Sequence, residues 1–364
     1  MKCAEVVVAG GGIAGRLLAW RLLRGGRRVL LVDRDPAGGA SAAWVAAAML
    51  APASEAVTSG PEVLAPGLAA LEQWRQWLAE LAADAGRVVP AGFTGSLVVA
   101  HPADRAELSW FAERLARIAG GEELAQSLDR AGLADLEPEL GRFDGGLWLP
   151  REGWLDNRAL FAALAEAIAV HGGQWLAAEV RAVFPGRVET DRGPLSCALA
   201  VDCRGFGAKG DWPALRGVRG EVARVRAPEV ALSRPVRLLH PRYQLYVAPR
   251  PDRHYVIGAT ELESESLAGV TVRSALELLS ALYSLHPGFG EAEILELAAH
   301  CRPAFADHLP RVAAEPGLLR ANGLYRHGYL LGPALVESAL AALAERPPAP
   351  PVRREEAPQL ESVR

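Results

Sequence analysis

A glycine-rich turn near the N-terminus constrains the fold of this chain more than any other feature. It lies between an expected buried strand, residues 5–9, and a segment of helical periodicity, residues 13–23. A second expected strand, residues 28–33, follows and ends at Asp33. The turn carries the pattern G-x-G-x-x-G, formed by Gly10, Gly12 and Gly15. Strand, glycine turn, helix and strand in this order predict a βαβ unit that binds a dinucleotide.

Each element of the pattern has a physical task in such a unit. Gly10 allows the tight turn, Gly12 lets the backbone approach a pyrophosphate, and Gly15 permits close packing of the helix. Asp33 would accept a hydrogen bond from a ribose hydroxyl and would repel a 2′-phosphate, which argues against NADP. The pattern does not choose between NAD and FAD, and a purely structural glycine turn is the alternative to a binding site.

Charge and cysteine content narrow the classes of partner. The 39 Lys and Arg residues against 43 Asp and Glu residues leave a net charge of −4, so nothing favours nucleic acid as a partner. The four cysteines lack the spacing of a zinc site, so we expect buried free thiols and no metal. The N-terminal run MKCAEVVVAGG is too short and too weakly charged for a signal peptide or a membrane span, and a cytoplasmic location is the default expectation.

The 364 residues are enough for two domains, and their segments alternate along the chain. An amphipathic helix is predicted for residues 61–86, further helix for 103–139, and alternating strands for 217–260. We therefore expect a discontinuous nucleotide-binding domain and an interleaved second domain built on an antiparallel sheet. The first would take residues 1–85, 145–215 and 300–346, the second 86–144 and 216–299, and a proline-rich tail, 347–364, would be disordered.

A helix start near the C-terminus has no side chain to cap it. The segment GLYRHGYLLGPALVESALAAL, residues 323–343, predicts a helix that begins at Gly332 and Pro333 rather than at Ser, Thr or Asp. Its first N–H groups and the positive end of its dipole are then available to a negatively charged group. We expect a cofactor beside this helix start.

Several segments together resemble one family. They are GGASAAWVAAAMLAP (38–52), YQLYVAPR (243–250), HYVIGATE (254–261), CRPAFADHLPRV (301–312) and GLYRHGYLLGPAL (323–335). In this order they resemble the flavin-dependent amine oxidases of the D-amino acid oxidase type, and within them the ThiO-type glycine oxidases of thiamine synthesis. The resemblance spans most of the chain.

The resemblance implies a fold, a cofactor and a reaction. The fold would be α/β, with an FAD-binding Rossmann-like domain of the glutathione-reductase type and an interleaved antiparallel-sheet α+β substrate domain. The cofactor would be FAD, and the substrate would be glycine or a similar small amino acid. Hydride would leave the α-carbon, the imine would be hydrolysed or passed on, and O₂ or another electron acceptor would reoxidise the flavin, O₂ giving peroxide. A homo-oligomer is compatible with this reading.

The resemblance also assigns residues. Tyr246 and Arg302 match the pair that holds the substrate carboxylate, and Met49 and Glu261 match further residues at the substrate. The positions matching cofactor-binding residues are Gly10, Gly12, Ala14, Gly15, Asp33, Arg34, Ala40, Ser41, Val180, Arg326, His327, Gly328, Leu330 and Leu331. We expect Arg326 and His327 to contribute backbone rather than side chains.

Residue chemistry supports the substrate pair independently. Two parallel N–H donors of Arg302 fit a carboxylate in a way that lysine could not reproduce. Arg302 precedes a proline in a segment with too few apolar alternations to be simply a strand face. Tyr246 lies in an alternating strand, where a half-buried structural tyrosine is the alternative. Because positioning and the cofactor supply most of the rate in hydride transfer, no base is obligatory, and His308 and His327 are expected to be structural.

Departures from the family pattern concern the substrate more than the cofactor. Glu261 stands where the family carries methionine, in the acidic run ELESES. A carboxylate facing the pocket would favour a cationic or amine-extended substrate, and a solvated loop is the alternative. Gln244 replaces a family histidine, and Ala48 replaces a family glycine.

Other functions remain open from the sequence. A D-amino acid or sarcosine oxidase, or a dehydrogenase that passes electrons to a quinone, would share the fold. A flavin oxidase that modifies tRNA would need a basic face, which the net charge of −4 does not supply. A non-catalytic nucleotide-binding module would share the glycine turn alone.

Overall fold

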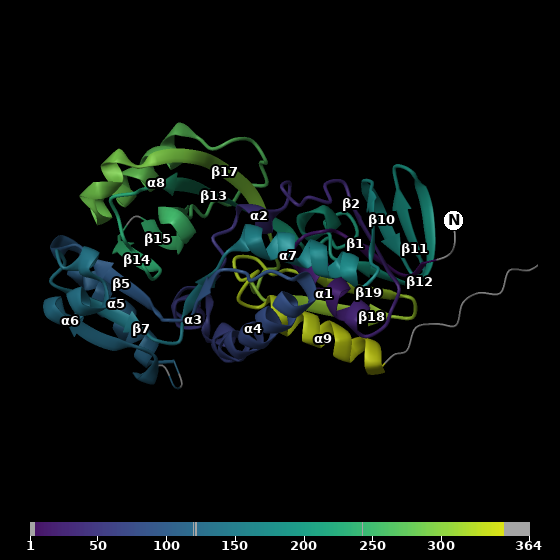
Figure 1. The fold of residues 1–364 in the computed structure, drawn as a ribbon, viewed down its shortest axis with the longest axis horizontal. Helices are drawn as coiled ribbons and strands as arrows, with labels where there is room; N and C mark the ends of the chain where they lie inside the picture. Colours follow the sequence, from purple (N-terminus) through teal and green to yellow (C-terminus); the bar gives the residue numbers. More distant parts are fainter. Residues whose placement is uncertain (1–3, 119, 121, 242, 346–364) are drawn as a thin grey trace, which may run out of the picture.

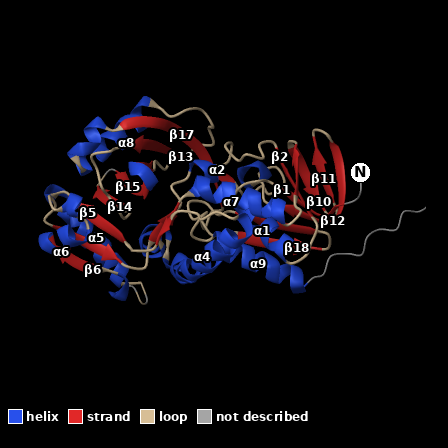
Figure 2. Ribbon diagram, in the orientation of Figure 1, coloured by secondary structure: helices blue, strands red, loops and turns tan. Residues whose placement is uncertain are grey.

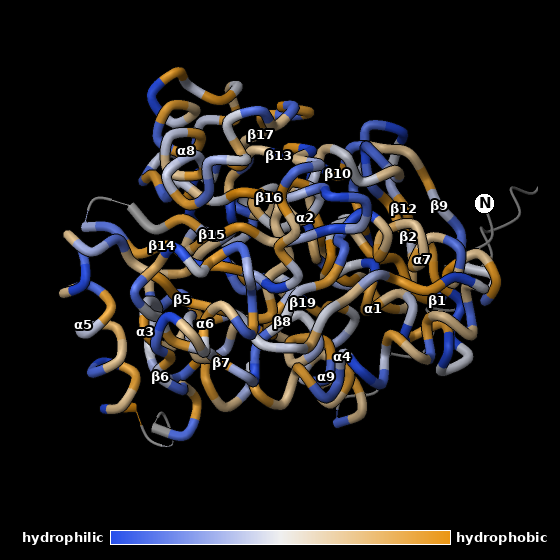
Figure 3. Tube along the Cα trace, turned by 60° about the vertical axis from the view of Figure 1, so that its left-hand side comes forward, coloured by the Kyte–Doolittle hydropathy of each residue, from blue (hydrophilic) through white to orange (hydrophobic). Residues whose placement is uncertain are grey.

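The computed structural model describes residues 4–118, 120, 122–241 and 243–345 (Figure 1). Its strands form two large sheets, one in each half of the molecule, and helices gather beside each of them (Figure 2). Hydrophobic segments occur in both halves (Figure 3), in agreement with a separate buried core beside each sheet. The expected combination of an α/β domain with an interleaved antiparallel-sheet domain is confirmed.

The first sheet is built around the βαβ unit. β1 (Ala4–Ala9) pairs in parallel with β2 (Val29–Asp33) and β12 (Gly193–Asp202), and α1 (Ile13–Arg24) connects β1 to β2. Residues 6–9 of β1 form an unbroken apolar run and are completely buried, as is typical of a strand covered on both faces of a parallel sheet. The strand order is β10-β11-β12-β1-β2-β9, with β19 beside β12 and β18 beside β19. The other strands are β9 (Gln174–Ala177), β10 (Val180–Phe184), β11 (Arg187–Thr190), β18 (Arg311–Glu315) and β19 (Leu318–Asn322).

A layer of helices packs against this sheet. It consists of α1, α4 (Leu64–Ala85), α7 (Asn157–Val170) and α9 (Gly332–Glu345), which contact one another. Trp20 of α1 and Trp77 of α4 meet edge to face with ring centroids 5.9 Å apart, and both are fully buried. The predicted helix 61–86 is therefore observed, with its first turn formed as a 3₁₀ helix.

The second sheet has the strand order β17-β13-β16-β15-β14-β5-β7-β6 and is antiparallel except between β14 and β5. Its strands are β5 (Ser96–Ala100), β6 (Gln126–Asp129), β7 (Gly145–Leu149), β13 (Arg216–Arg226), β14 (Val236–His240), β15 (Tyr243–Arg250), β16 (His254–Gly258) and β17 (Glu293–Ala304). Helices α5 (Arg105–Ala116), α6 (Arg130–Leu136) and α8 (Val272–Leu285) pack on it. Short elements are α2 (Ala42–Val45), β3 (Met49–Leu50), α3 (Pro52–Ser59), β4 (Ala91–Gly92) and β8 (Gly153–Leu155).

Strand pairing departs from the expected boundaries at three places. β7 pairs with β5 and β6, so residues 145–149 belong to the second sheet and not to the nucleotide-binding segment. β17 pairs with β13 up to Ala304, beyond the expected end at residue 299. β6 interrupts the helix expected for 103–139, because its backbone completes the edge of the sheet beside β7. The expected tail, 347–364, lies outside the described residues.

Within the described part of the chain, no helix is long and apolar enough to cross a membrane. The same residues hold no group of His, Cys, Asp and Glu side chains arranged for a metal ion. Cys197, Cys203 and Cys301 are buried and form no disulfide with one another, as expected, and Cys3 lies outside the described residues. Burial raises the pKa of the Cys203 thiol well above its ordinary value, which makes this thiol inert.

Candidate active site

A cavity of about 410 Å³ is lined by residues of both halves of the molecule. One end lies where β1 and β2 finish, beside Gly10 and Arg34. The other end lies against β13, β15 and β17, which contribute Gly220, Tyr246 and Arg302. Ligands of parallel α/β sheets bind at the carboxyl ends of the strands. A long ligand in this cavity can therefore reach from the glycine turn to the second sheet.

The glycine turn leaves room for a phosphate-bearing ligand. Gly10 has φ +101°, and a side chain there would meet the carbonyl oxygen of Cys203 at 2.5 Å. A methyl group at Gly15 would overlap the carbonyl oxygen of Gly10, whereas one at Gly12 would meet nothing within 4 Å. The first turn of α1 contains no acidic residue, and Gly12 provides no side-chain cap. The free N–H groups and the helix dipole therefore fit the pyrophosphate of a dinucleotide.

Asp33 is oriented by the same turn. Its Oδ2 accepts a hydrogen bond from the Gly11 N–H at 2.6 Å, and its side chain lines the cavity. Arg16 stabilises the turn, because its Nε donates to the Gly11 carbonyl at 2.7 Å. The Arg16 guanidinium lies over the rings of Phe161 and Trp175, at 4.6 Å and 4.7 Å from their centroids. The carboxylate at the end of β2 is thus held where a ribose hydroxyl would donate to it.

The segment after β2 is ordered by its own hydrogen bonds. The N–H of Ala40 donates to the Asp35 carboxylate at 2.8 Å, and Ser41 caps α2 by accepting from the Trp44 N–H at 3.2 Å. The Ser41 hydroxyl donates to the Gly38 carbonyl at 2.7 Å. These bonds fix Ala40 and Ser41 against the cavity, beside the glycine turn.

Ala48 adopts a backbone conformation that favours glycine. Its φ is +49°, which explains why the resemblance implies a glycine at this position. The preceding residue, Ala47, accepts a hydrogen bond from Nη2 of buried Arg250 at 2.6 Å. This contact holds the strained turn that carries Met49 to the cavity wall.

Most residues expected to bind the cofactor line this cavity. They are Gly10, Gly12, Ala14, Asp33, Arg34, Ala40, Ser41, Val180, Arg326, Gly328 and Leu330. Gly15, His327 and Leu331 are not among its lining residues. Gly15 packs against the backbone of Gly10, and His327 and Leu331 are buried behind the wall, with 1% and 2% exposure. These three residues support the wall rather than form it.

The four residues expected at the substrate, Met49, Tyr246, Glu261 and Arg302, line the same cavity. Contrary to expectation, Arg302 lies within a regular strand, β17, where it pairs with Val218 of β13. Its Nη1 and Nη2 both donate to the carbonyl oxygen of Thr260 at 3.2 Å. The remaining N–H groups of the guanidinium are available to a carboxylate.

Two glycines make room for the substrate pair. A methyl group at Gly220 would overlap the Arg302 guanidinium, and one at Gly258 would come within 2.5 Å of the Tyr246 hydroxyl. Withdrawal from water raises the pKa of Tyr246, although the positive charges of Arg302 and Arg326 oppose this shift. The hydroxyl therefore stays protonated and can donate a hydrogen bond.

Arg326 lies between two carboxylates, so its side chain and not only its backbone takes part in the site. Its Nε is 2.8 Å from Oε2 of Glu55, and its Nη1 donates to Oε2 of Glu261 at 2.8 Å. Glu55 also contacts Arg237 at 3.3 Å and His327 at 3.4 Å. Burial would raise the pKa of Glu55, but Arg326 first, and then the His327 hydrogen bond and Arg237, hold it far below its usual range. Glu55 is therefore an anion.

Glu261 faces the cavity, but its charge is not free. The Tyr325 hydroxyl donates to its Oε1 at 2.6 Å, and Arg326 pairs with its Oε2. Although burial would raise the pKa of Glu261, Arg326 and then Tyr325 lower it. Because the carboxylate is already paired, it gives less preference for a cationic substrate than an isolated acid would.

Glu55 was missed by the sequence analysis. It lies in α3, in the apolar run MLAPASEAV, and is 7% exposed. An acidic residue inside such a run is the one signal that could have indicated a buried, paired carboxylate. Neither His308 nor His327 is among the residues that line the cavity, in agreement with the structural roles expected for them.

The C-terminal helix begins at Gly332, as predicted. The segment before it, including Gly328, Tyr329 and Leu330, lines the cavity. The Leu331 N–H donates to the His327 carbonyl at 2.7 Å, which turns the chain from the cavity wall into the helix.

Comparisons with known proteins agree with this arrangement. Residues 5–341 match the DAO family, FAD dependent oxidoreductase. The chain is 42% identical over 344 residues to the putative thiamine biosynthesis oxidoreductase ThiO of Rhizobium etli, covering 94% of this chain and 97% of that protein. It superposes on the glycine oxidase of Geobacillus kaustophilus with a TM-score of 0.83 at 26% identity, over 94% of both chains. Glycine oxidase of Bacillus cereus ATCC 14579 shares the fold, with a TM-score of 0.80 at 23% identity over 94% of this chain and 96% of that one.

The chain belongs to the DAO family of FAD-dependent oxidoreductases, and FAD is its cofactor. Within this family it is similar to ThiO of Rhizobium etli over nearly its whole length. The family resemblance seen in the sequence is thereby confirmed.

Proposed function

We propose that this protein oxidises glycine, or an amino acid with a similarly small α-substituent, to the imine and supplies it to the synthesis of the thiamine thiazole. The observation that carries the proposal is the single cavity lined by both the glycine turn and the pair Arg302 and Tyr246. The name of one similar protein, a glycine oxidase, supports the substrate, and the name of another, a thiamine biosynthesis oxidoreductase, supports the role in thiamine synthesis. When bound, FAD supplies the two-electron acceptor for the α-carbon hydride.

The side chains support recognition of a small α-amino acid. Arg302 retains N–H groups that do not bind Thr260 and can donate to the carboxylate, and the protonated Tyr246 hydroxyl provides a further donor. Both side chains occupy space that glycines leave open, at Gly220 and Gly258. Met49 lines the same cavity. Positioning of the carboxylate by these groups would hold the α-carbon in one place, which is the main contribution a protein makes to hydride transfer.

The acidic residues at this end of the cavity favour a reaction without a protein base. The pKa values of both Glu55 and Glu261 are lowered, so both carboxylates stay ionised but are weak bases. We therefore propose that the substrate reacts in the form in which its own amino group is neutral. This group loses its proton before hydride transfer. Arg326 would then line the cavity with its positive charge neutralised by Glu55 and Glu261.

The proposed function is tested with the purified protein in two steps. Its absorbance should show flavin bands, and a colourless preparation that takes up no FAD would refute the cofactor. The flavoprotein is then supplied in air with glycine, sarcosine, D-alanine and D-proline, and peroxide is measured. The largest kcat/KM should be for glycine. Preference for another of the four would assign a sarcosine or D-amino acid oxidase, whereas dye reduction without peroxide would assign a dehydrogenase.

A further inference from the structure

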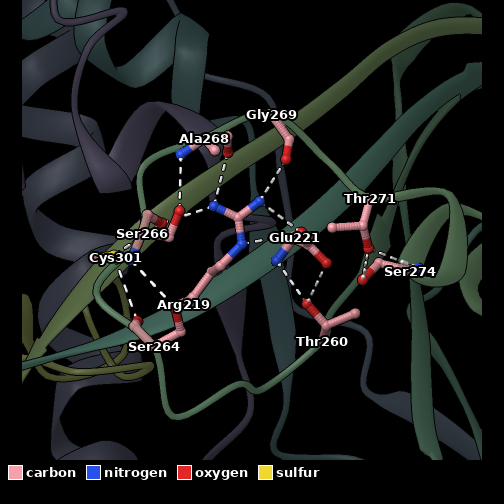
Figure 4. A network of polar contacts seen from close by, with 10 residues as sticks. All are labelled: Arg219, Glu221, Thr260, Ser264, Ser266, Ala268, Gly269, Thr271, Ser274 and Cys301. Atoms are coloured by element: carbon pink, nitrogen blue, oxygen red, sulfur yellow. Dashed lines mark hydrogen bonds and ion pairs between the residues drawn. The ribbon is translucent and has the colours of Figure 1, made fainter.

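A buried ionic network is formed by the two residues of β13 that flank Gly220, a residue of the cavity wall (Figure 4). Its centre is Arg219 of β13, whose Nε and Nη2 donate to Oε1 of Glu221 at 3.0 Å and 2.6 Å. The other guanidinium donors bind backbone carbonyls of the segment after β16. Nη1 donates to Ser266 and Ala268, and Nη2 donates to Gly269, each at 2.7 Å. All five N–H donors of Arg219 are thus used.

Glu221 connects this network to Thr260. The Thr260 hydroxyl donates to Oε2 of Glu221 at 3.2 Å and accepts from the Glu221 N–H at 3.0 Å. The Thr260 N–H donates to the Glu221 carbonyl at 3.2 Å. Burial would raise the pKa of Glu221, but hydrogen bonds from Ser274 and Arg219 lower it, so the carboxylate stays ionised.

Thr260 in turn holds the substrate-side arginine. Its carbonyl oxygen accepts from both Nη1 and Nη2 of Arg302 at 3.2 Å. The guanidinium also lies against Gly220, the residue between Arg219 and Glu221. Arg302 is therefore held on two sides. Its guanidinium packs against Gly220 of β13 and donates to Thr260, which Glu221 of β13 binds.

Burial makes this connection rigid. Glu221 is completely buried and Arg219 is 4% exposed, so water cannot replace the bonds between them. A long arginine side chain would otherwise lose conformational entropy when it binds a carboxylate, because rotation about several of its bonds would stop. Because the Thr260 carbonyl already fixes both Nη atoms, much of this entropy is lost on folding instead of on binding.

We propose that Glu221 and Thr260 are positioning residues that pre-orient Arg302 for the substrate carboxylate. The inference rests on the proposed function, because it takes Arg302 as the carboxylate anchor. Neither residue is required to touch the substrate. Their effect is on the affinity for carboxylate-bearing ligands and not on the chemistry that follows.

The test compares Thr260→Val, Glu221→Gln and Thr260→Ser in the FAD-loaded protein. Steady-state oxidation of glycine gives KM and kcat, and titration of the flavin absorbance gives Kd for glycolate and for its carboxylate-free analogue glycolamide. Matched controls are Thr190→Val, a buried threonine of β11 that bonds only to its own turn, and Glu137→Gln, a buried glutamate bound to Ser233. Unfolding temperature and flavin spectrum are recorded for each variant.

Thr260→Val and Glu221→Gln should each raise KM for glycine and Kd for glycolate by about tenfold, since a weakened charged hydrogen bond is worth that much. The kcat value and the Kd for glycolamide should stay within about twofold. Thr260→Ser, which keeps the hydroxyl, and both controls should match the wild type. If Glu221→Gln does not fold, the result for Thr260→Val alone decides whether the inference holds. Wild-type affinities in Thr260→Val, or an equal loss for glycolate and glycolamide, would overturn the inference. A wild-type protein that oxidises no amino acid would instead refute the proposed function.

Discussion

The guanidinium of Arg302 packs directly on the backbone of Gly220, with no space between them for a methyl group. The two residues lie on adjacent strands, β17 and β13, and Gly220 is central to β13. A glycine inside a strand usually marks a bulge or a close approach. Here it marks the close approach of the substrate-side arginine.

Replacing Gly220 with alanine should displace Arg302 from the cavity. Since a misplacement of about 1 Å at a reacting centre can reduce the rate about 100-fold, we expect a loss of this order in kcat/KM for glycine. Gly210→Ala is the matched control, because a methyl group there meets nothing within 4 Å. Steady-state kinetics of both variants, with flavin content measured in parallel, would check the prediction. Equal activity of the two variants would contradict it.

Replacing Arg302 with lysine should weaken substrate binding although the positive charge is kept. A lysine ammonium cannot present the paired planar donors of the guanidinium. Loss of one hydrogen bond to a charged group costs about 1.5 to 3 kcal/mol, so KM for glycine should rise roughly tenfold or more. Flavin should stay bound, because Arg302 lies at the far end of the cavity from the glycine turn. An unchanged KM would remove Arg302 from the site.

The two glycines of the N-terminal turn should respond differently to substitution. A methyl group at Gly12 meets nothing within 4 Å, so Gly12→Ala should fold as apoprotein with nearly normal stability but bind FAD weakly. A methyl group at Gly15 overlaps the Gly10 carbonyl, so Gly15→Ala should lose about 1 to 3 kcal/mol of stability even without FAD. Urea unfolding of the apoproteins and FAD titration separate the two effects. Equal stability losses would contradict the assignment of Gly12 to cofactor contact.

Local patterns were sufficient to predict the βαβ unit and its glycine turn, whereas the other cofactor positions were implied by the family resemblance. Apolar periodicity and glycine spacing act within about 30 residues of sequence, and this is the range that contains β1, the glycine turn, α1 and β2. The strand containing Arg302 was not recognised, because β17 is an edge strand whose burial is uneven and whose alternation is weak. Its pairing with β13 is decided by hydrogen bonds between distant segments.

The charged network could not be derived from the sequence for a similar reason. Glu55 and Arg326 are far apart in the chain and meet only when α3 and the segment before α9 come together. Glu261 remained open between a pocket group and a solvated loop, and its partners, Tyr325 and Arg326, come from that same C-terminal segment. The family resemblance indicated these positions but not which of them pair.

The two carboxylates that share Arg326 should differ in their effect on stability. Glu55 is buried, so Glu55→Gln leaves Arg326 and Arg237 without their common anion and should cost about 3 to 5 kcal/mol. The Glu261 side chain is 44% exposed, and Glu261→Gln should cost about 1 kcal/mol or less.

The pKa of Glu55 is lowered on folding, so its contribution to stability is present above the unfolded pKa of about 4.3 and is lost as pH falls toward the folded pKa. Urea unfolding of the wild type and Glu55→Gln should therefore show a constant difference between about pH 6 and pH 8 that shrinks below about pH 4. A difference that instead grows on acidification would mean that Glu55 is protonated in the native protein.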